Sequence, residues 1–186
     1  METKEKGIIY DPKDQSFDCY VDSNFAGIWP AEDTPDDVNT ARSRTGFIIS
    51  YANCLIVWAS KLQIQVALSM TEAEYIALCM ALREVIPIME LIKEMKEQGF
   101  VDMQSTPTVH CVAFKGNSGA LILATEHKLR LRTKHINCQY HHFRQYVNSG
   151  EIVIKDIHTT LQRADMLTKP NNLMDLLRHR KATMGW

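Results

Sequence analysis

The sequence predicts an α/β domain in which a five-stranded mixed sheet carries helices on both faces. Two runs of β-branched and aromatic residues, separated by two turn residues, predict a hairpin early in the 186-residue chain. A long stretch with helical spacing follows, and later strand-like runs alternate with further helical stretches. An antiparallel start followed by strands joined through helices is typical of a mixed sheet with helices on both faces.

The first three strands are expected to be antiparallel neighbours. Apolar residues alternate with polar ones from position 17 onward, which predicts a strand that ends near Asp22. The runs 45–51 and 54–60 predict the second and third strands. Because only Ala52 and Asn53 separate these two runs, a tight hairpin is expected between them.

The remaining elements are helices with two more strands between them. Ser69 and Thr71 each precede a glutamate by three residues, so the longest helix is expected to begin near Thr71 and to end near Gly99. A last helix is expected to begin after Thr159 and to stop at Lys169 and Pro170. Between them, the pattern predicts strands over 108–114 and 152–157 and helices over 118–124 and 136–147.

Length and composition fit one globular domain in a chain that is 45% hydrophobic and 23% charged. We expect a flexible N-terminal remnant over 1–6, the domain over 7–174 and a tail over 175–186. The apolar runs are too short for a membrane span, no signal peptide is recognised, and five cysteines without a C-x-x-C pair suggest reduced thiols. These features predict an intracellular protein that makes no membrane contact.

Charge is unevenly distributed although the net charge is only −1. Residues 1–127 carry 10 basic and 18 acidic side chains, whereas residues 128–186 carry 11 basic and 4 acidic ones. A basic half beside an acidic half is compatible with phosphate binding next to a metal-binding carboxylate cluster. Folding can equally interleave the two halves into ordinary surface ion pairs.

Four segments resemble, in order, the motifs of ribonuclease H domains in copia-type retrotransposon polyproteins. Residues 20–27, YVDSNFAG, resemble the family's D-A-D-W-A-G stretch, and residues 69–75, SMTEAEY, resemble S-S-T-E-A-E-Y. Residues 114–120, FKGNSGA, stand where the family reads F-E-D-N-x-G-A. The fourth segment runs from RTKHI at 132–136 to ADMLTKP at 164–170, similar to R-T-K-H-I and A-D-I/M-L/F-T-K. Together these motifs identify the chain as a member of this family.

The resemblance implies a ribonuclease H-like fold and a nuclease that cuts the RNA strand of RNA–DNA hybrids with two Mg²⁺ or Mn²⁺ ions. It assigns Asp22, Glu74 and Asp165 as catalytic residues and metal ligands. Hard cations require oxygen ligands, so acids from distant positions must converge on one spot. Taken separately, each of the three is more simply an ordinary surface acid, and only the motif context favours the catalytic role. The resemblance also implies an upstream reverse transcriptase as a partner domain, and a cytoplasmic particle or the nucleus as location.

Gly116 breaks the pattern, because the family carries a catalytic aspartate at this position. Phe114 before it and residues 117–120 after it fix the register without a gap. Glycine offers no ligand, and losing a metal ligand is expected to cost orders of magnitude in rate. We therefore predict weak or absent cleavage.

Several other residues are weaker candidates. His158 stands in the loop where related ribonucleases H carry a histidine that aids product release, although a structural loop histidine is at least as good an explanation. His135, Cys138 and His142 share a helix face, but they lack a fourth zinc ligand. Contacts to nucleic acid, largely through its backbone, are expected from a set of basic and amide side chains: Lys61, Gln63, Asn117, Arg130, Arg132, Lys134 and Arg163.

Three hypotheses on function follow. The first is a metal-dependent endonuclease that acts on RNA–DNA hybrids. The second is a non-catalytic module that binds hybrids or tethers a reverse transcriptase. The third is a decayed transposon remnant. Cleavage separates the first from the others, and salt-dependent hybrid binding without cleavage favours the second.

Overall fold

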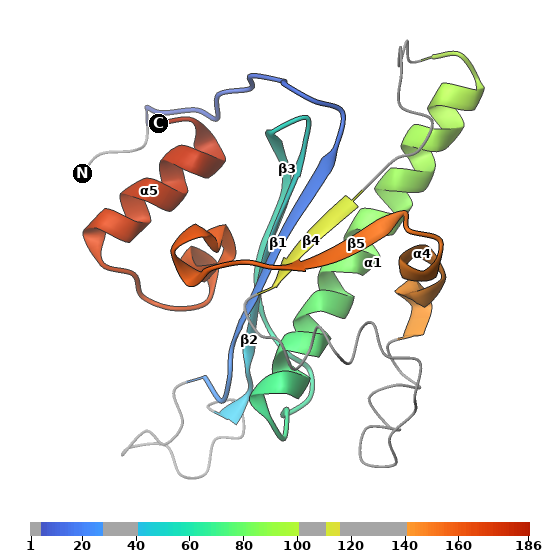
Figure 1. Ribbon diagram of the computed structural model, residues 1–186. Coiled ribbons are helices and arrows are strands. Elements are labelled where there is room, and N and C mark those ends of the chain that lie inside the picture. The colour runs from blue at the N-terminus through green and yellow to red at the C-terminus, as the bar shows by residue number, and fades with distance from the viewer. Residues whose placement is uncertain (1–4, 28–40, 101–110, 116–140) are drawn as a thin grey trace.

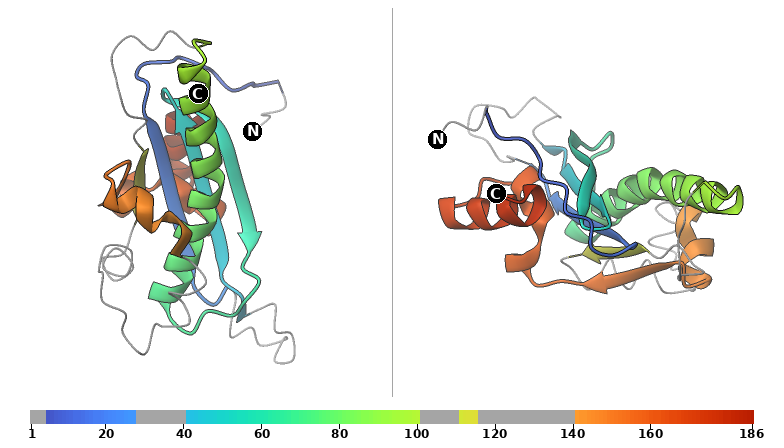
Figure 2. Two further views of the ribbon diagram at one scale, coloured as in Figure 1. Left: turned by 90° about the vertical axis from the view of Figure 1, so that its right-hand side faces the viewer. Right: turned by 90° about the horizontal axis from the view of Figure 1, so that it is seen from above.

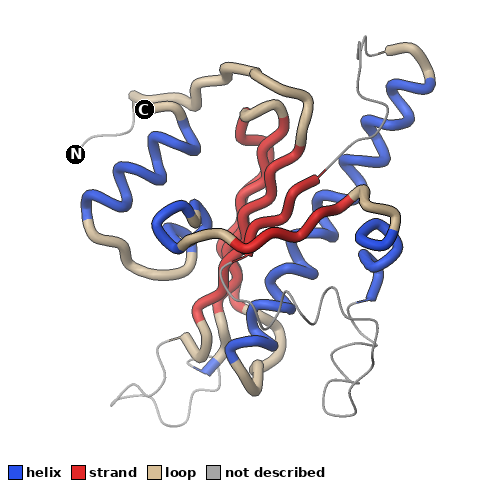
Figure 3. Tube along the Cα trace, in the orientation of Figure 1, coloured by secondary structure: helices blue, strands red, loops and turns tan. Residues whose placement is uncertain are grey.

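The computed structural model describes residues 5–27, 41–100, 111–115 and 141–186. A single five-stranded sheet forms its centre, with strand order β3-β2-β1-β4-β5 (Figures 1 and 3). The strands are β1 (Phe17–Asn24), β2 (Arg44–Tyr51), β3 (Cys54–Leu62), β4 (Cys111–Lys115) and β5 (Ile152–Asp156).

The direction of the strands confirms the predicted mixed sheet. β1 lies in the middle, antiparallel to β2 and parallel to β4. β3 is antiparallel to β2, and β5 is parallel to β4. Ala52 and Asn53 form the predicted turn between β2 and β3, and both have positive φ angles, of 52° and 63°. The register places Asp22 of β1 opposite Gly46 of β2, near the carboxyl end of β1.

Helix α1 (Met70–Glu97) covers one face of the sheet (Figure 2). Ser69 caps it by accepting a hydrogen bond from the backbone N–H of Glu72 at 3.2 Å, as the spacing predicts. The helix continues through Pro87 and ends with a C-cap at Gln98. Its buried side chains pack against the inward-facing residues of β1, and the two sets together form the main core: Tyr75, Leu78, Leu82, Val85 and Met89 from α1, and Phe17, Cys19 and Val21 from β1.

The other face of the sheet carries the C-terminal part of the chain. Two short 3₁₀ turns, η4 (Thr159–Leu161) and η5 (Arg163–Leu167), lead into α5 (Leu173–Met184). Ala164 of η5 packs in a second, smaller core with Tyr20, Ile48 and Leu55. In Figure 2, α1 and α5 lie on opposite sides of the sheet, as predicted for helices on both faces.

The prediction of a last helix after Thr159 is wrong. The chain there forms η4 and η5, and the helix begins only at Leu173, where Asn172 accepts a hydrogen bond from the backbone N–H of Asp175 at 2.9 Å. Lys169 and Pro170 therefore precede a helix and do not end one. Most of α5 lies in the stretch 175–186 that was expected to be a tail.

The described part of the predicted helix over 136–147 is helical throughout. It consists of the 3₁₀ turn η3 (His141–Phe143) and α4 (Arg144–Asn148). The predicted helix over 118–124 lies outside the described residues. No helix in the described part of the chain is both long and apolar enough to span a membrane.

The two ends of the described chain are held together. The backbone N–H of Ile9 donates to the carbonyl of Met184 at 3.0 Å, and the indole N–H of Trp186 donates to the carbonyl of Gly7 at 2.6 Å. The indole ring also lies beside the cationic groups of Lys6 and Arg180. These contacts attach the end of α5 to the segment that precedes β1.

Candidate functional site

Asp22 and Asp165, two of the three predicted carboxylates, meet where η5 crosses the carboxyl end of β1. The Thr168 hydroxyl, just after η5, donates a hydrogen bond to Asp22 Oδ2. Asp165 is 8% exposed, and its Oδ2 lies 3.0 Å from the ammonium group of Lys169. Each acid thus has a donor from the segment 163–169 beside it.

The pKa of Asp22 is affected by the charges of both other predicted acids. Burial is the largest cause that raises the pKa of the Asp22 carboxyl, which reaches about 6. The negative charges of Asp165 and Glu74 raise it further, whereas the Thr168 hydrogen bond and the charge of Lys169 lower it. Carboxylates whose pKa is raised by burial and by neighbouring negative charges are typical of functional sites.

Glu74 lies on α1, one turn beyond its capped start. The three acids supply only oxygen atoms, which is the donor set that hard divalent cations prefer. In this conformation, no three His, Cys, Asp or Glu side chains of the described residues are close enough to hold a metal ion. The ammonium group of Lys169 provides the positive charge next to Asp165 instead.

Three contacts hold η5 in place over the sheet. The side-chain amide of Gln162 donates to the carbonyl of Val21 at 2.9 Å, and the hydroxyl of Ser60 donates to the carbonyl of Leu167 at 2.6 Å. Gly46 allows the closest approach: a Cβ atom there would lie 2.6 Å from Thr168 Cγ2 and 2.9 Å from Leu167 Cβ. The missing side chain of Gly46 therefore lets Thr168 reach Asp22.

Replacing Gly46 by alanine is expected to push η5 away from the sheet and to lower the free energy of unfolding by about 1–3 kcal/mol. Urea denaturation measures this change. Gly7→Ala is the matched control, because a Cβ atom at Gly7 would meet nothing within 4 Å. Equal stability of the two variants would show that the close approach of η5 at Gly46 does not matter.

Among the residues expected to contact nucleic acid, Lys61 lies at the same end of the sheet as Asp22. It is exposed and pairs in register with Thr45, which in turn faces Ser23, the neighbour of Asp22. The backbone of Lys61 therefore lies two strands away from β1, roughly 10 Å. It is at the same end of the strands as Asp22.

Gln63 does not fit the prediction of a nucleic-acid contact, and this assignment is corrected. The side chain is 1% exposed, and its amide nitrogen donates to Ala73 O at 2.7 Å and to Thr45 Oγ1 at 3.1 Å. These bonds connect the end of β3 and β2 with the start of α1. The residue therefore braces the helix that carries Glu74.

Arg163 and His158 make contacts of other kinds. The guanidinium group of Arg163 lies 4.7 Å from the ring centre of Tyr20, and Arg163 lines a pocket together with Asn53 of the β2–β3 turn. His158 is exposed, and its Nδ1 lies 2.9 Å from Thr160 Oγ1 and accepts from the Thr160 N–H at 3.3 Å. These local bonds cap η4, which agrees with the structural explanation of this histidine.

The remaining predicted residues lie outside the described residues. They are Gly116, Asn117, Arg130, Arg132 and Lys134, together with His135 and Cys138 of the zinc hypothesis. The strand before Gly116 is described, and its last residue, Lys115, pairs with Val21, the residue before Asp22. β4 therefore ends one residue short of the position of Asp22 on the neighbouring strand.

Thr168, Lys169 and Gly46 belong to this site but were not predicted as functional residues. Thr168 and Lys169 both lie within the matched segment ADMLTKP, so the motif contained the signal. Gly46 had no sequence signal, because its role depends on a close approach between segments more than a hundred residues apart.

The sequence has relatives among plant transposon proteins, although no family model matches it. It is 33% identical over 159 residues to the retrovirus-related Pol polyprotein from transposon TNT 1-94 of Nicotiana tabacum, covering 84% of this chain. It is 34% identical over 155 residues to that from transposon RE2 of Arabidopsis thaliana, covering 83% of this chain. The chain spans only 11% and 10% of the length of these two proteins.

Solved structures with a similar fold are ribonucleases H. LC11-RNase H1, isolated from compost by a metagenomic approach, matches with a TM-score of 0.53 and 13% identity over 83% of this chain and 93% of that one. In its complex with an RNA/DNA hybrid, the same protein matches with a TM-score of 0.50 and 16% identity over 82% and 94%. At these identities the likeness concerns the fold. Together with the sequence relatives, it shows that this chain belongs to the retrotransposon Pol polyprotein family, as its ribonuclease H-like domain.

Proposed function

We propose that this domain binds RNA–DNA hybrids and divalent magnesium or manganese, and that it hydrolyses the RNA strand only weakly. The observation that carries the proposal is the pKa of about 6 at Asp22, raised by burial and by the nearby charges of Asp165 and Glu74. A cluster of acids that repel one another gains most from a bound cation. The resemblance of three sequence motifs supports the same three acids as catalytic residues.

Asp22, Glu74 and Asp165 are the side chains that would hold the metal ions. When bound, two such ions activate the attacking water and stabilise the charge of the leaving oxygen during phosphodiester hydrolysis. Thr168 orients Asp22 by donating to Oδ2, which leaves Oδ1 available as a ligand. Lys169 holds Asp165 in place through an ion pair, and its ammonium group competes with a cation for that carboxylate.

We propose weak cleavage because Gly116 replaces an aspartate of the family motif. The family's third aspartate is absent, and the basic Lys115 stands beside the gap. Fewer carboxylates bind magnesium less firmly, and one ligand fewer leaves an ion less well positioned beside the scissile phosphate. Asn117 offers a neutral amide oxygen, which is a weaker ligand than a carboxylate.

A non-catalytic hybrid-binding module is the second candidate function, and the substitution at Gly116 is the observation that favours it. Binding needs cationic side chains and a matching shape, neither of which depends on the third aspartate. The basic C-terminal stretch 128–186 and Lys61 supply positive charge. A decayed transposon remnant is the proposal that remains if both binding and cleavage are absent.

Hybrid binding is expected to be measurable by fluorescence anisotropy with a short labelled RNA–DNA duplex. The affinity should fall steeply between 50 and 200 mM salt, because phosphate contacts release counterions. Lys61→Gln should weaken binding about twofold to fivefold, since one phosphate contact is removed.

Lys96→Gln is the control with the same charge change. Lys96 lies 22 residues beyond Glu74 on α1, about 33 Å along the helix. Equal weakening by both variants, or no saturable binding at 50 mM salt, would contradict hybrid binding at this edge of the sheet.

A further inference from the structure

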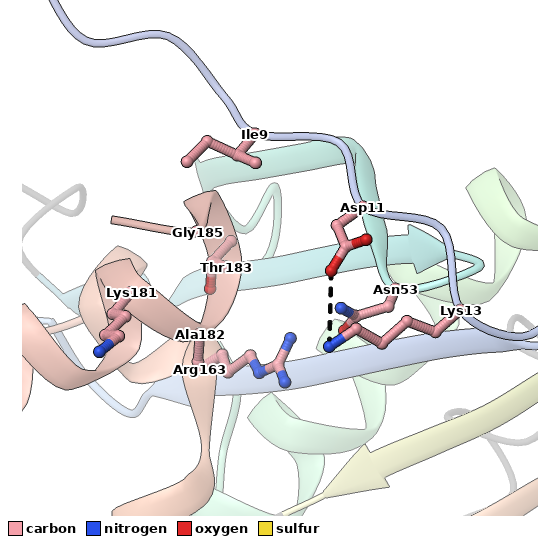
Figure 4. Close-up of a pocket in the computed structure, with 9 residues that line it drawn as sticks. All are labelled: Ile9, Asp11, Lys13, Asn53, Arg163, Lys181, Ala182, Thr183 and Gly185. Atoms are coloured by element: carbon pink, nitrogen blue, oxygen red, sulfur yellow. Dashed lines mark ion pairs between the residues drawn. The ribbon is translucent and has the colours of Figure 1, made fainter.

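A pocket of about 440 Å³ lies at the end of the sheet opposite Asp22. The segment before β1, the turn between β2 and β3, η5 and the last turn of α5 form its walls (Figure 4). Asn53 of the turn lies beside the start of β1, because Tyr51 pairs with Phe17. Phe17 precedes Asp22 by five residues, about 16 Å along the strand. The pocket extends from there to Arg163, which packs on Tyr20, and none of the three acids Asp22, Glu74 and Asp165 lines it.

Arg163 dominates the chemistry of this pocket. Its guanidinium group packs on the ring of Tyr20 and extends toward Asn53 and Lys13 (Figure 4). Within the described residues, this guanidinium group has no ion pair and no hydrogen bond. An arginine held by an aromatic ring, with its donors unused, is preorganised to bind an oxyanion with two parallel hydrogen bonds.

Other donors line the same pocket. Lys13, Lys181 and the amide of Asn53 contribute, and Thr183 in its wall is 7% exposed with a hydroxyl that has no partner among the described residues. Asp11 is the acid in the lining, and it already pairs with Lys13 at 3.6 Å. Donors and positive charges therefore exceed acceptors and negative charges in this pocket.

Two features oppose an anion here, and both are partly offset. The C-terminal end of α5 carries partial negative charge, but its Lys181 and Met184 carbonyls accept hydrogen bonds from the backbone N–H groups of Gly185 and Ile9. Asp18 on β1 lies near Arg163. Burial raises the pKa of the Asp18 carboxyl by more than the charge of Arg163 lowers it.

We propose that this pocket is a second phosphate-binding site, which takes a phosphate monoester of nucleotide size. Arg163 binds the phosphate, Asn53 and Lys13 donate from the opposite wall, and the apolar side chains of Ile9 and Ala182 contact the rest of the ligand. The volume lies in the range of small-molecule sites. The site needs neither the metal nor the carboxylate cluster, so it does not depend on the cleavage proposed above.

The test is an NMR titration of the ¹⁵N-labelled chain in EDTA, at low salt, with inorganic phosphate, adenosine 5′-monophosphate and a dinucleotide with or without a 5′-phosphate. We expect saturable shifts at the side-chain amide of Asn53 and at Arg163 Nε, with none at Asp22. Arg163→Gln should weaken nucleotide binding at least tenfold, and Arg163→Lys, which keeps the charge but loses the paired donors, about threefold to tenfold. Lys155→Gln, an exposed site on β5, should change the affinity less than twofold.

The nucleotide probes distinguish the source of the phosphate. Binding of the 5′-phosphorylated dinucleotide as well as the monophosphate supports a strand end as ligand, and binding of the monophosphate alone supports a free nucleotide. If Arg163→Gln does not fold, Lys13→Gln replaces it, with an expected loss of about threefold. The proposal is overturned if no probe shifts Asn53, if the Arg163 or Lys13 variants bind as the unmodified chain does, or if Lys155→Gln weakens binding equally.

Discussion

Gly116→Asp is expected to raise the rate of RNA cleavage at least a hundredfold in the presence of magnesium. The substitution restores the carboxylate that the family motif carries between Phe114 and Asn117. Lys115, just before it, pairs in register with Val21, which precedes Asp22 in β1. A metal stabilises the transition state by several kcal/mol, and about 3 kcal/mol corresponds to roughly a hundredfold in rate. Single-turnover cleavage of an end-labelled RNA–DNA hybrid measures the effect.

Two controls make the cleavage experiment decisive. Gly116→Asn has nearly the same shape as the restored aspartate but no charge, so it should give little or no gain. Adding Asp165→Asn to Gly116→Asp should remove the gain, because it neutralises another member of the same cluster. Equal and robust cleavage by the unmodified chain and by Gly116→Asp would contradict the proposal that Gly116 limits the activity.

Asp22→Asn is expected to stabilise the fold at pH 7.5 by up to about 3 kcal/mol in the absence of metal. The pKa of the Asp22 carboxyl rises from 3.8 to about 6 on folding, mainly through burial. Folding therefore takes up a proton between about pH 4 and pH 6, and the free energy of unfolding falls as the pH rises through this window. Asparagine carries no charge and still offers an oxygen to the Thr168 hydroxyl.

Urea denaturation at several pH values checks this prediction. The gain from Asp22→Asn should shrink below about 1 kcal/mol near pH 4, where the native carboxyl is already neutral. Asp156→Asn, at an exposed position at the end of β5, should stay within about 0.5 kcal/mol at both pH values. A loss of stability at pH 7.5 in the Asp22 variant would mean that its charge stabilises the fold.

Local sequence patterns predicted most of the sheet and the start of α1, because these elements depend on short-range signals. The alternation at 17–22 and the Ala52-Asn53 turn fix β1 and the hairpin, and Ser69 caps α1 where the spacing indicates. The segment after β5 was not predicted correctly. Thr159 and Gln162 have the spacing of a helix cap, but Gln162 instead binds the carbonyl of Val21, a contact across 141 residues.

The candidate site was predicted in its acids but not in its surroundings. Motif matches named Asp22, Glu74 and Asp165, and in the structure the charges of Glu74 and Asp165 both raise the pKa of Asp22. Residue type alone could not distinguish Arg163 from Lys61. Arg163 lines a pocket with residues of the β2–β3 turn, whereas Lys61 lies at the end of the strands where Asp22 is found. Gln63 was misassigned for the same reason, since an amide can brace a helix as well as bind a phosphate.

Whether the three remaining carboxylates still bind a divalent cation is tested most directly by titrating magnesium into the unmodified chain at pH 7.5, with and without a hybrid. Calorimetry gives the affinity, and NMR identifies the residues affected. We predict saturable binding that shifts signals at Asp22, Glu74 and Asp165, strengthens with the hybrid, tightens at least tenfold in Gly116→Asp and disappears in Asp22→Asn. Magnesium binding that Asp22→Asn leaves unchanged, or no binding even with the hybrid present, would contradict the account.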